Sequence, residues 1–327
     1  MSLAVWPSIS PEDLKTREAE SLKNELDWIL DESLETCKEL KHGLEDCYAL
    51  LAPIDPGSTL VMSTPRNEKV KGTITRVGTR IVKGTLNLQP RSGQPQTLSI
   101  SPSHPIYLPA LAALNTHLNQ AVDLIGVTLS QPQSSDAPSL ASTLALLADS
   151  ITQSLALLKG LPLEESDPTW QTASCPPQHF VPALAPNTSF HVGIQESCIV
   201  LWLRVLEPLD APVNFGLKFG LAIGTVRRLE HDEMDLVFRF DPAGDGSTAG
   251  DKKAAQPPPP RLSGTRDDGT AASQPAGEHE VYVREKIRVV SADPSLISLY
   301  SKLGYLGHML SQTRRNLAAV MGSDADD

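Results

Sequence analysis

The sequence predicts an α+β fold: an elongated, antiparallel four-helix bundle plus a β-sheet module made from two separate strand sets. Four long segments repeat apolar residues at steps of three and four, the spacing of one buried helix face. Two sets of short segments alternate apolar and polar residues, which is typical of strands with one buried face. Because no helical pattern interrupts either strand set, helices and strands are expected in separate modules.

Four helices are predicted in chain order. Ser10 is a suitable N-cap for the first, Pro11 suits its first position, and Pro53 lies just beyond its end. The segments 106–131 and 136–159 follow one another across a short polar connection, which favours antiparallel neighbours. The fourth helix covers 293–321. The residues predicted to form the bundle seam are Leu26, Leu30, Leu34, Leu44, Leu118, Ile125, Leu147, Ile151, Leu303, Leu306 and Leu310.

The strand sets cover 58–101 and 187–290. Gly78 indicates a tight turn within a hairpin, and 198–209 is apolar on both faces, as expected of a central strand. Residues 241–277 are rich in Pro, Gly and charge and are predicted to be a disordered loop.

The domain prediction assigns 10–52, 105–160 and 293–321 to the bundle and the two strand sets to the β module. The last helix is expected to pack against the first, which would bury its leucine seam inside the chain. Gly304 and Gly307 disfavour an isolated helix and are therefore expected where neighbouring helices approach closely.

Composition excludes several classes of function. The 327 residues carry a net charge of −11, and this acidity disfavours general binding to nucleic acid or to anionic lipid. No signal peptide is recognised and no window has the apolar length of a membrane span, so a cytoplasmic protein is expected. The four cysteines include no CxxC pair, which does not favour structural zinc, and Cys37 and Cys47 are expected to be small core residues.

No established catalytic motif for phosphate, zinc or dinucleotide chemistry is present. His191 and Cys198 lie on neighbouring predicted strands and could pair as nucleophile and base, although no orienting carboxylate is evident. The cluster His231–Asp235 could hold a cation, but an exposed charged turn is favoured. Gly216, Gly220 and Gly224 indicate a glycine-rich loop or bent strand. The sequence therefore predicts no enzyme, no catalytic residue, no cofactor and no metal.

Four segments, in the same order, resemble the Rogdi family. They are REAESLKNELDWILDESLETCKELKHGLEDCYALL, VKGTITRVGTRIVKGTLNLQ, HFVPALAPNTSFHVGIQESCIVLWLRVLEPL and VREKIRVVSADPSLISLYSKLGYLGHML. In the third, Phe180, Pro182, Ala183, Leu184 and Pro186 are similar to the family's F-x-P-A-L-P step. The N-terminal extension and the insertion 241–277 depart from the family's animal pattern.

The resemblance implies a non-catalytic subunit of the RAVE complex, which promotes assembly of the peripheral sector of the vacuolar proton ATPase onto its membrane sector. The implied partners are a large subunit containing β-propellers, a small F-box-type adaptor and, directly or indirectly, the peripheral sector. The implied location is cytoplasmic, at the surface of vacuolar and endosomal membranes, without insertion into them. Two alternatives remain: a homodimeric coiled-coil scaffold in endosomal trafficking, or an enzyme using His191, Cys198 or the His231–Asp235 cluster.

Overall fold

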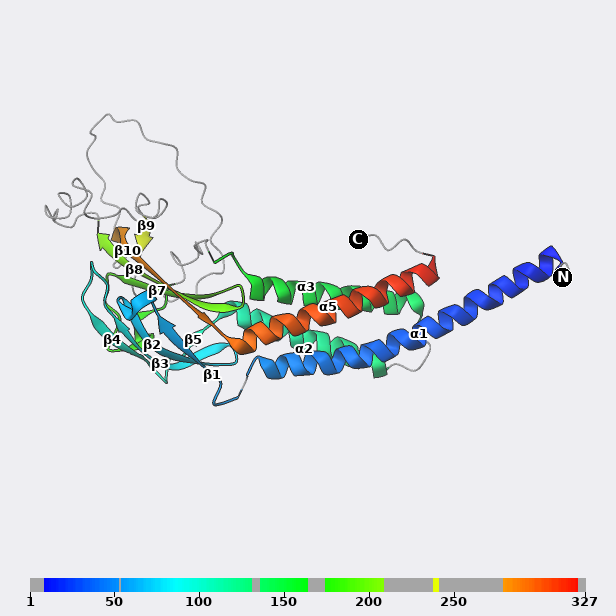
Figure 1. Ribbon diagram of the computed structural model, residues 1–327, viewed down its shortest axis with the longest axis horizontal. Helices are drawn as coiled ribbons and strands as arrows, with labels where there is room; N and C mark the ends of the chain where they lie inside the picture. The colour runs from blue at the N-terminus through cyan, green and yellow to red at the C-terminus, as the bar shows by residue number, and fades with distance from the viewer. Residues whose placement is uncertain are drawn as a thin grey trace, which may run out of the picture. The chain divides into compact units, whose positions relative to one another are not determined.

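The computed structural model describes residues 9–52, 54–130, 136–163, 174–208, 238–240 and 279–322. The chain divides into two compact units, each built from several parts of the sequence. The helical unit contains Met1–Asp55, Pro109–Gly160 and Pro294–Asp327, and the strand unit contains Pro56–Leu108 and Leu161–Asp293 (Figure 1). The predicted loop 241–277 lies outside the described residues.

In the described part of the helical unit there are four helices: α1 (Pro11–Leu50), α2 (Pro109–Ser130), α3 (Ala137–Lys159) and α5 (Pro294–Met321). Helix α1 contacts α2 and α5, and α3 also contacts α2 and α5. Each helix buries one apolar face, as the three-and-four spacing predicts. On α2 this face includes Leu111, Leu114 and Leu118, and on α3 it includes Leu140 and Leu144.

The predicted antiparallel four-helix bundle is wrong. Strand segments separate the helices in the chain, with β1–β5 between α1 and α2 and β6–β10 between α3 and α5. The helices are also unequal, because α1 has 40 residues where α2 has 22 and α3 has 23. Apolar spacing shows which face of a helix is buried, but it does not show how far along the helix that burial extends. The described residues instead give an α+β chain with four helices and two antiparallel sheets.

The buried face of α1 is rotated from the predicted one near its middle. Ile29, Ser33 and Cys37 are buried, whereas Leu30 and Leu34 are half-buried. Ser33 tolerates burial because its hydroxyl donates a hydrogen bond to the backbone carbonyl of Ile29, at 2.6 Å. A small polar residue can therefore take a core position that the sequence pattern assigned to leucine.

Helix α5 buries its leucines without interruption. The gap in its apolar repeat is filled by Thr313, which is buried and whose hydroxyl donates to the carbonyl of Met309 at 3.1 Å. Its two glycines have different surroundings. A Cβ at Gly307 would lie 3.3 Å from Cγ2 of Ile151, but a Cβ at Gly304 would meet nothing within 4 Å. The expected close approach therefore occurs at Gly307 and not at Gly304.

Gly304→Ala is expected to raise the free energy of unfolding by about 1 kcal/mol, because alanine favours the helix and no neighbour opposes its methyl group. Thermal unfolding followed by far-UV circular dichroism measures the effect. Gly307→Ala is the matched control three residues away and should gain clearly less, because its methyl group must displace Ile151. An equal gain at both positions would contradict the difference in packing.

Helix α3 is the helix of the described residues that is long and apolar enough to cross a membrane by length and composition. The sequence expectation was that no segment would reach this threshold. The helix places Leu147, Ile151 and Leu158 in the core of the helical unit, against α2 and α5. The core helix of a water-soluble protein passes the same test, so this single match is weak support for a membrane span.

The described residues of the strand unit form two antiparallel sheets. The first has the order β1-β2-β3-β4-β6, with β5 also paired to β3, and the second has the order β7-β8-β10-β9. The strands of the first sheet are β1 (Ser58–Ser63), β2 (Val70–Val77), β3 (Arg80–Leu88), β4 (Gln96–Ile100), β5 (Ile106–Tyr107) and β6 (Phe180–Val181). The strands of the second are β7 (Thr188–Gln195), β8 (Cys198–Pro208), β9 (Phe238–Phe240) and β10 (His279–Ala292). The two predicted strand sets thus form two sheets.

Two local strand predictions are confirmed. β2 and β3 form a hairpin whose turn contains Gly78 at φ +57°, a backbone region that favours glycine. β8 pairs with β7 on one side and with β10 on the other, as expected of a strand that is apolar on both faces. The strand interior is well packed, because the cavity between Met62 and Leu86 of the first sheet and Phe190 and Leu201 of the second measures only about 10 Å³.

Among the described residues, two ion pairs with buried carboxylates join distant parts of the strand unit. Nε of Arg76, on β2, lies 2.7 Å from Oδ2 of Asp293, just after β10, and neither side chain is exposed. Nζ of Lys69 lies 2.9 Å from Oε1 of Glu285 on β10, and the backbone N–H of Ser92 donates to the other oxygen of that carboxylate at 2.8 Å. Hydrogen bonds to these carboxylates offset the cost of burying them.

Candidate functional site

The His191–Cys198 pair is not assembled. His191 pairs in register with Trp202, whereas Cys198 pairs with Gln195 at the turn between β7 and β8. Four residues of extended strand separate these positions, or roughly 13 Å at about 3.3 Å per residue. Burial, followed by the charges of Glu196 and Asp293, raises the pKa of the Cys198 thiol, so it is held in its less nucleophilic, protonated form.

The other cysteines and the metal candidates give no site. Burial raises the pKa of Cys37 to about 11 and that of Cys47 to about 12, which keeps both thiols neutral inside the helical unit. Across the described parts of the chain, no three His, Cys, Asp or Glu side chains gather closely enough to hold a metal ion. The cluster His231–Asp235 and the glycines 216, 220 and 224 lie outside the described residues.

Most residues of the predicted seam are buried in the helical unit. Leu26, Leu30 and Leu34 are half-buried. The buried members are Leu44, Leu118, Ile125, Leu147, Ile151, Leu303, Leu306 and Leu310. Because the leucines of α5 are covered by other helices of the same chain, they are occupied in maintaining the fold and do not present a seam to a partner.

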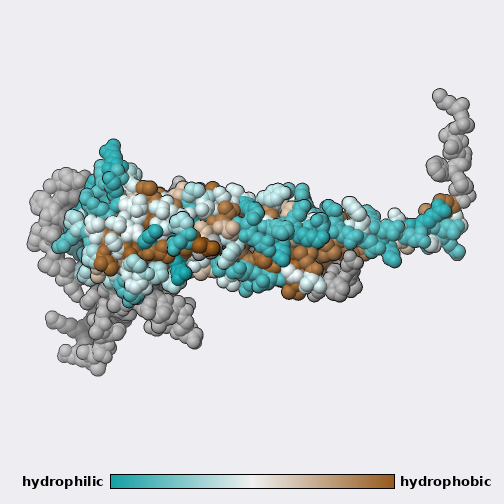
Figure 2. Space-filling model, turned by 90° about the horizontal axis from the view of Figure 1, so that it is seen from below, coloured by the Kyte–Doolittle hydropathy of each residue, from teal (hydrophilic) through white to brown (hydrophobic). Residues whose placement is uncertain are grey.

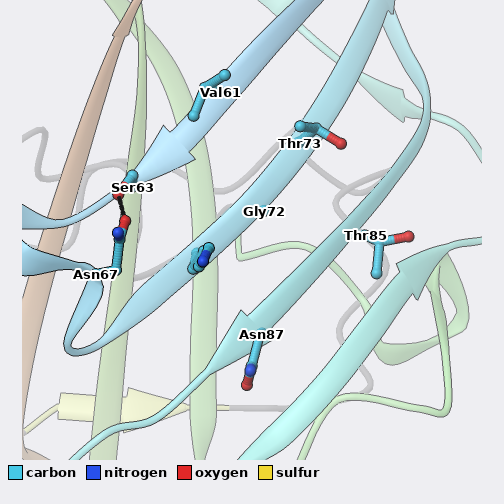
Figure 3. Close-up of a pocket in the computed structure, with 8 residues that line it drawn as sticks. Val61, Ser63, Asn67, Gly72, Thr73, Thr85 and Asn87 are labelled. Carbon is cyan, nitrogen blue, oxygen red and sulfur yellow. Dashed lines mark hydrogen bonds between the residues drawn. The ribbon is translucent and has the colours of Figure 1, made fainter.

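A polar groove lies on the exposed face of β1, β2 and β3 (Figure 3) and has a volume of about 740 Å³. Two cross-strand rows line it. The lining residues are Val61, Thr73 and Thr85 in one row, Ser63, Lys71 and Asn87 in the other, and Gly72 and Asn67 beside them. Strand alternation places both rows on the same face, opposite the core residues Met62 and Leu86.

The chemistry of the polar groove is that of hydrogen bonding. It offers the hydroxyls of Thr73 and Thr85, the amide of Asn87 and the ammonium group of Lys71. Asn67 is oriented by Ser63, whose hydroxyl donates to its side-chain oxygen. These groups can pair with a polar surface, and they include no acid, thiol or imidazole that could serve as a general base or nucleophile.

A second feature is a cluster of three cationic side chains around the buried Trp202 in the second sheet. The Lys286 Nζ lies 4.6 Å from the centre of the indole ring, and the guanidinium carbons of Arg204 and Arg288 lie 5.2 Å and 5.6 Å from it. Register explains the arrangement, because Trp202 pairs with Arg288 and Arg204 with Lys286. The ring face attracts each cation. The cluster concentrates positive charge on a chain whose net charge is −11.

The sequence predicted neither the polar groove nor the cluster of cations around Trp202. Alternating Thr, Lys and Asn in β2 and β3 predicted an exposed face, but the groove depends on the register of three strands, which a single sequence does not fix. The cations around Trp202 similarly come from β8 and β10, where the pairs Trp202–Arg288 and Arg204–Lys286 each join residues more than eighty positions apart. The sequence feature that could have indicated the cluster is the presence of Trp202 and Arg204 on a strand predicted to be central, where a charged residue is unusual.

The comparison with protein-family models gives one match, to the family described as "Rogdi leucine zipper containing protein", over residues 25–318. A search of the curated proteins finds no significant match. The family match includes all of α2, α3 and both sheets, and it reaches the last turn of α5. It covers the second, third and fourth of the segments that resemble this family in the sequence, and the first segment from residue 25 onward. The chain therefore belongs to the Rogdi leucine zipper family.

Proposed function

We propose that this chain is a non-catalytic subunit of the RAVE complex, which promotes assembly of the peripheral sector of the vacuolar proton ATPase onto its membrane sector. The observation that carries the proposal is the family match over residues 25–318, which includes most of both units. The partners would be the large β-propeller subunit, the small F-box-type adaptor and, directly or through these, the peripheral sector.

The mechanism would be contact between rigid surfaces. The polar groove lies on a sheet whose interior is closely packed, so it can hold a partner at a fixed geometry. The protein would act in the cytoplasm, at the surface of vacuolar and endosomal membranes and without inserting into them. The internal burial of the α5 leucines argues against the alternative of a homodimer built on that helix.

Deletion of the gene tests the proposal. Cells lacking the protein are expected to have less acidic vacuoles and less of the ATPase peripheral sector in the membrane fraction. Restoring the wild-type gene should return both values to normal. The double variant His191→Ala/Cys198→Ala should restore them equally well, because contact and not catalysis is proposed. Normal acidity together with a normal membrane-bound fraction in the deletion strain would refute the proposal.

A further inference from the structure

Among the residues that the structure describes, no neighbour covers the N-terminal part of α1, Pro11–Trp28, which we call the α1 overhang. Its side chains are exposed throughout, except for the half-buried Leu26, and continuous burial begins only at Ile29. Figure 1 shows α1 continuing past the neighbouring helices of its unit, and Figure 2 shows this end covered mainly by hydrophilic side chains. At about 1.5 Å per residue the α1 overhang is roughly 27 Å long.

The sequence specifies a helix here even though no other described segment packs on it. Ser10 caps the helix, since its Oγ accepts the backbone N–H of Asp13 at 3.1 Å and donates to the Asp13 carboxylate at 2.7 Å. Pro11 occupies the first turn. An isolated helix of this length is only marginally stable in water. The α1 overhang is therefore a defined surface that would gain stability from a packing partner.

Large apolar side chains are exposed along the α1 overhang. Leu14, Leu22 and Trp28 are exposed to 55%, 54% and 63% respectively. Leu14, Glu18 and Leu22 follow at steps of four and so lie on the same side of the helix. A single exposed leucine is ordinary, but several along one unpacked helix are typical of a helix-binding surface.

Charge decides which partner fits. The α1 overhang carries six carboxylates and three basic side chains. A second copy would bring two negative helices together, and an anionic membrane would be repelled in the same way. A helix with apolar residues on one side and lysine or arginine beside them would match both features. The family match begins at residue 25, so Leu14, Glu18 and Leu22 precede it and Trp28 lies within it.

We propose that the α1 overhang binds a basic amphipathic helix of a partner protein. Leu14 and Leu22 would pack against the apolar side of the partner, and Glu18 between them would pair with one of its cations. Trp28, which is about 40° around the helix from Leu14 and about 120° from Leu22, would pack at the border of this face. The proposal does not depend on the ATPase role, because it concerns only the chemistry of the partner. A failure to bind would therefore not refute the proposed function, which gene deletion tests separately.

Binding of synthetic helices to the full chain tests this proposal. The probe is a fluorescent peptide with leucine at heptad positions a and d and lysine elsewhere, followed by anisotropy. Two reference peptides carry glutamate in place of lysine, or the same lysines with scrambled leucines. The lysine–leucine heptad peptide is expected to bind at least about tenfold more tightly than either, since both apolar contact and opposite charge are required.

Variants locate the binding surface. Leu22→Ala/Trp28→Ala should weaken binding at least about tenfold, as truncating buried anchors does. Leu146→Ala on α3 is the matched control, because Leu146 is equally exposed at 58%, and it should leave binding unchanged. Glu18→Lys should weaken binding of the lysine peptide and strengthen that of the glutamate peptide. Unchanged circular dichroism would show that each variant is folded.

Three outcomes would overturn the proposal. One is equal binding of the lysine and glutamate peptides, and another is equal binding of the scrambled peptide, which would show attraction by charge alone. The third is dimerisation of the full chain in light scattering that disappears in Leu22→Ala/Trp28→Ala, because the occupant would then be a second copy.

Discussion

Asp293→Ala is expected to lower the free energy of unfolding of the strand unit by about 3–5 kcal/mol, the usual cost of breaking a buried ion pair. The variant leaves the Arg76 guanidinium in a site with no solvent exposure and without the carboxylate that lies 2.7 Å from its Nε. Urea unfolding followed by tryptophan fluorescence, to which Trp202 of the same unit contributes, measures the change.

A surface ion pair of equal length provides the control. Lys38 and Glu35 on α1 are also separated by 2.7 Å, but their side chains are exposed to 57% and 63%. Glu35→Gln should therefore cost less than about 1 kcal/mol. The double variant Arg76→Met/Asp293→Leu should recover much of the loss, because no buried charge remains. Similar small losses for Asp293→Ala and Glu35→Gln would show that burial does not determine the strength of the pair.

The large cost follows from the position of Asp293 in the strand unit. Its other carboxylate oxygen accepts a hydrogen bond from the Ser58 hydroxyl at 3.2 Å, and Arg76 donates from Nη1 to the carbonyl of Gly78 at 2.7 Å. The pair thus connects the start of β1, the end of β2 and the residue after β10. Removing the carboxylate leaves several groups without their partner in a region closed to water.

Local patterns in the sequence predicted the elements better than their assembly. Ser10, Pro11 and the spacing of leucines placed the start and buried face of the helices, and Gly78 placed a hairpin, because caps, turns and periodicity are local properties. The bundle could not be predicted correctly from the same seams. The predicted seam of α1 begins at Leu26, yet the structure buries the helix continuously only from Ile29. Whether an apolar face is covered depends on which other segments reach it.

The candidate surfaces depended still more on long-range placement. Arg76 and Asp293 are separated by 217 positions, and each alone is an ordinary charged residue that would be expected at the surface. The same holds for Lys286 and Arg204, which meet at Trp202 only through the register of β8 and β10. Conversely, His191 and Cys198 are close in sequence and on paired strands, but register places them at different points along the ladder.

Leu303→Ala and Leu306→Ala are each expected to lower the free energy of unfolding by about 2–5 kcal/mol, because both side chains are almost completely buried and alanine would leave a cavity. Urea unfolding followed by far-UV circular dichroism measures the loss in the helical unit. An unchanged unfolding midpoint in both variants would show that α5 does not contribute to the core. Tyr305→Ala, at a site exposed to 65% on the same helix, should change stability far less.

Gly43 distinguishes the two leucines. A Cβ at Gly43 would lie 2.5 Å from Cδ2 and 3.0 Å from Cδ1 of Leu306, closer than carbon atoms can pack. Gly43→Ala should therefore destabilise the protein, since overpacking costs about 1–3 kcal/mol and outweighs the gain of about 1 kcal/mol in helix propensity.

In the Leu306→Ala background the clash is absent and the added methyl group fills part of the cavity. Gly43→Ala should then become neutral or stabilising, with a coupling of about 1–3 kcal/mol. Combined with Leu303→Ala, its effect should be closer to additive. Additive behaviour with both leucines would mean that α1 and α5 are not in close contact at Gly43.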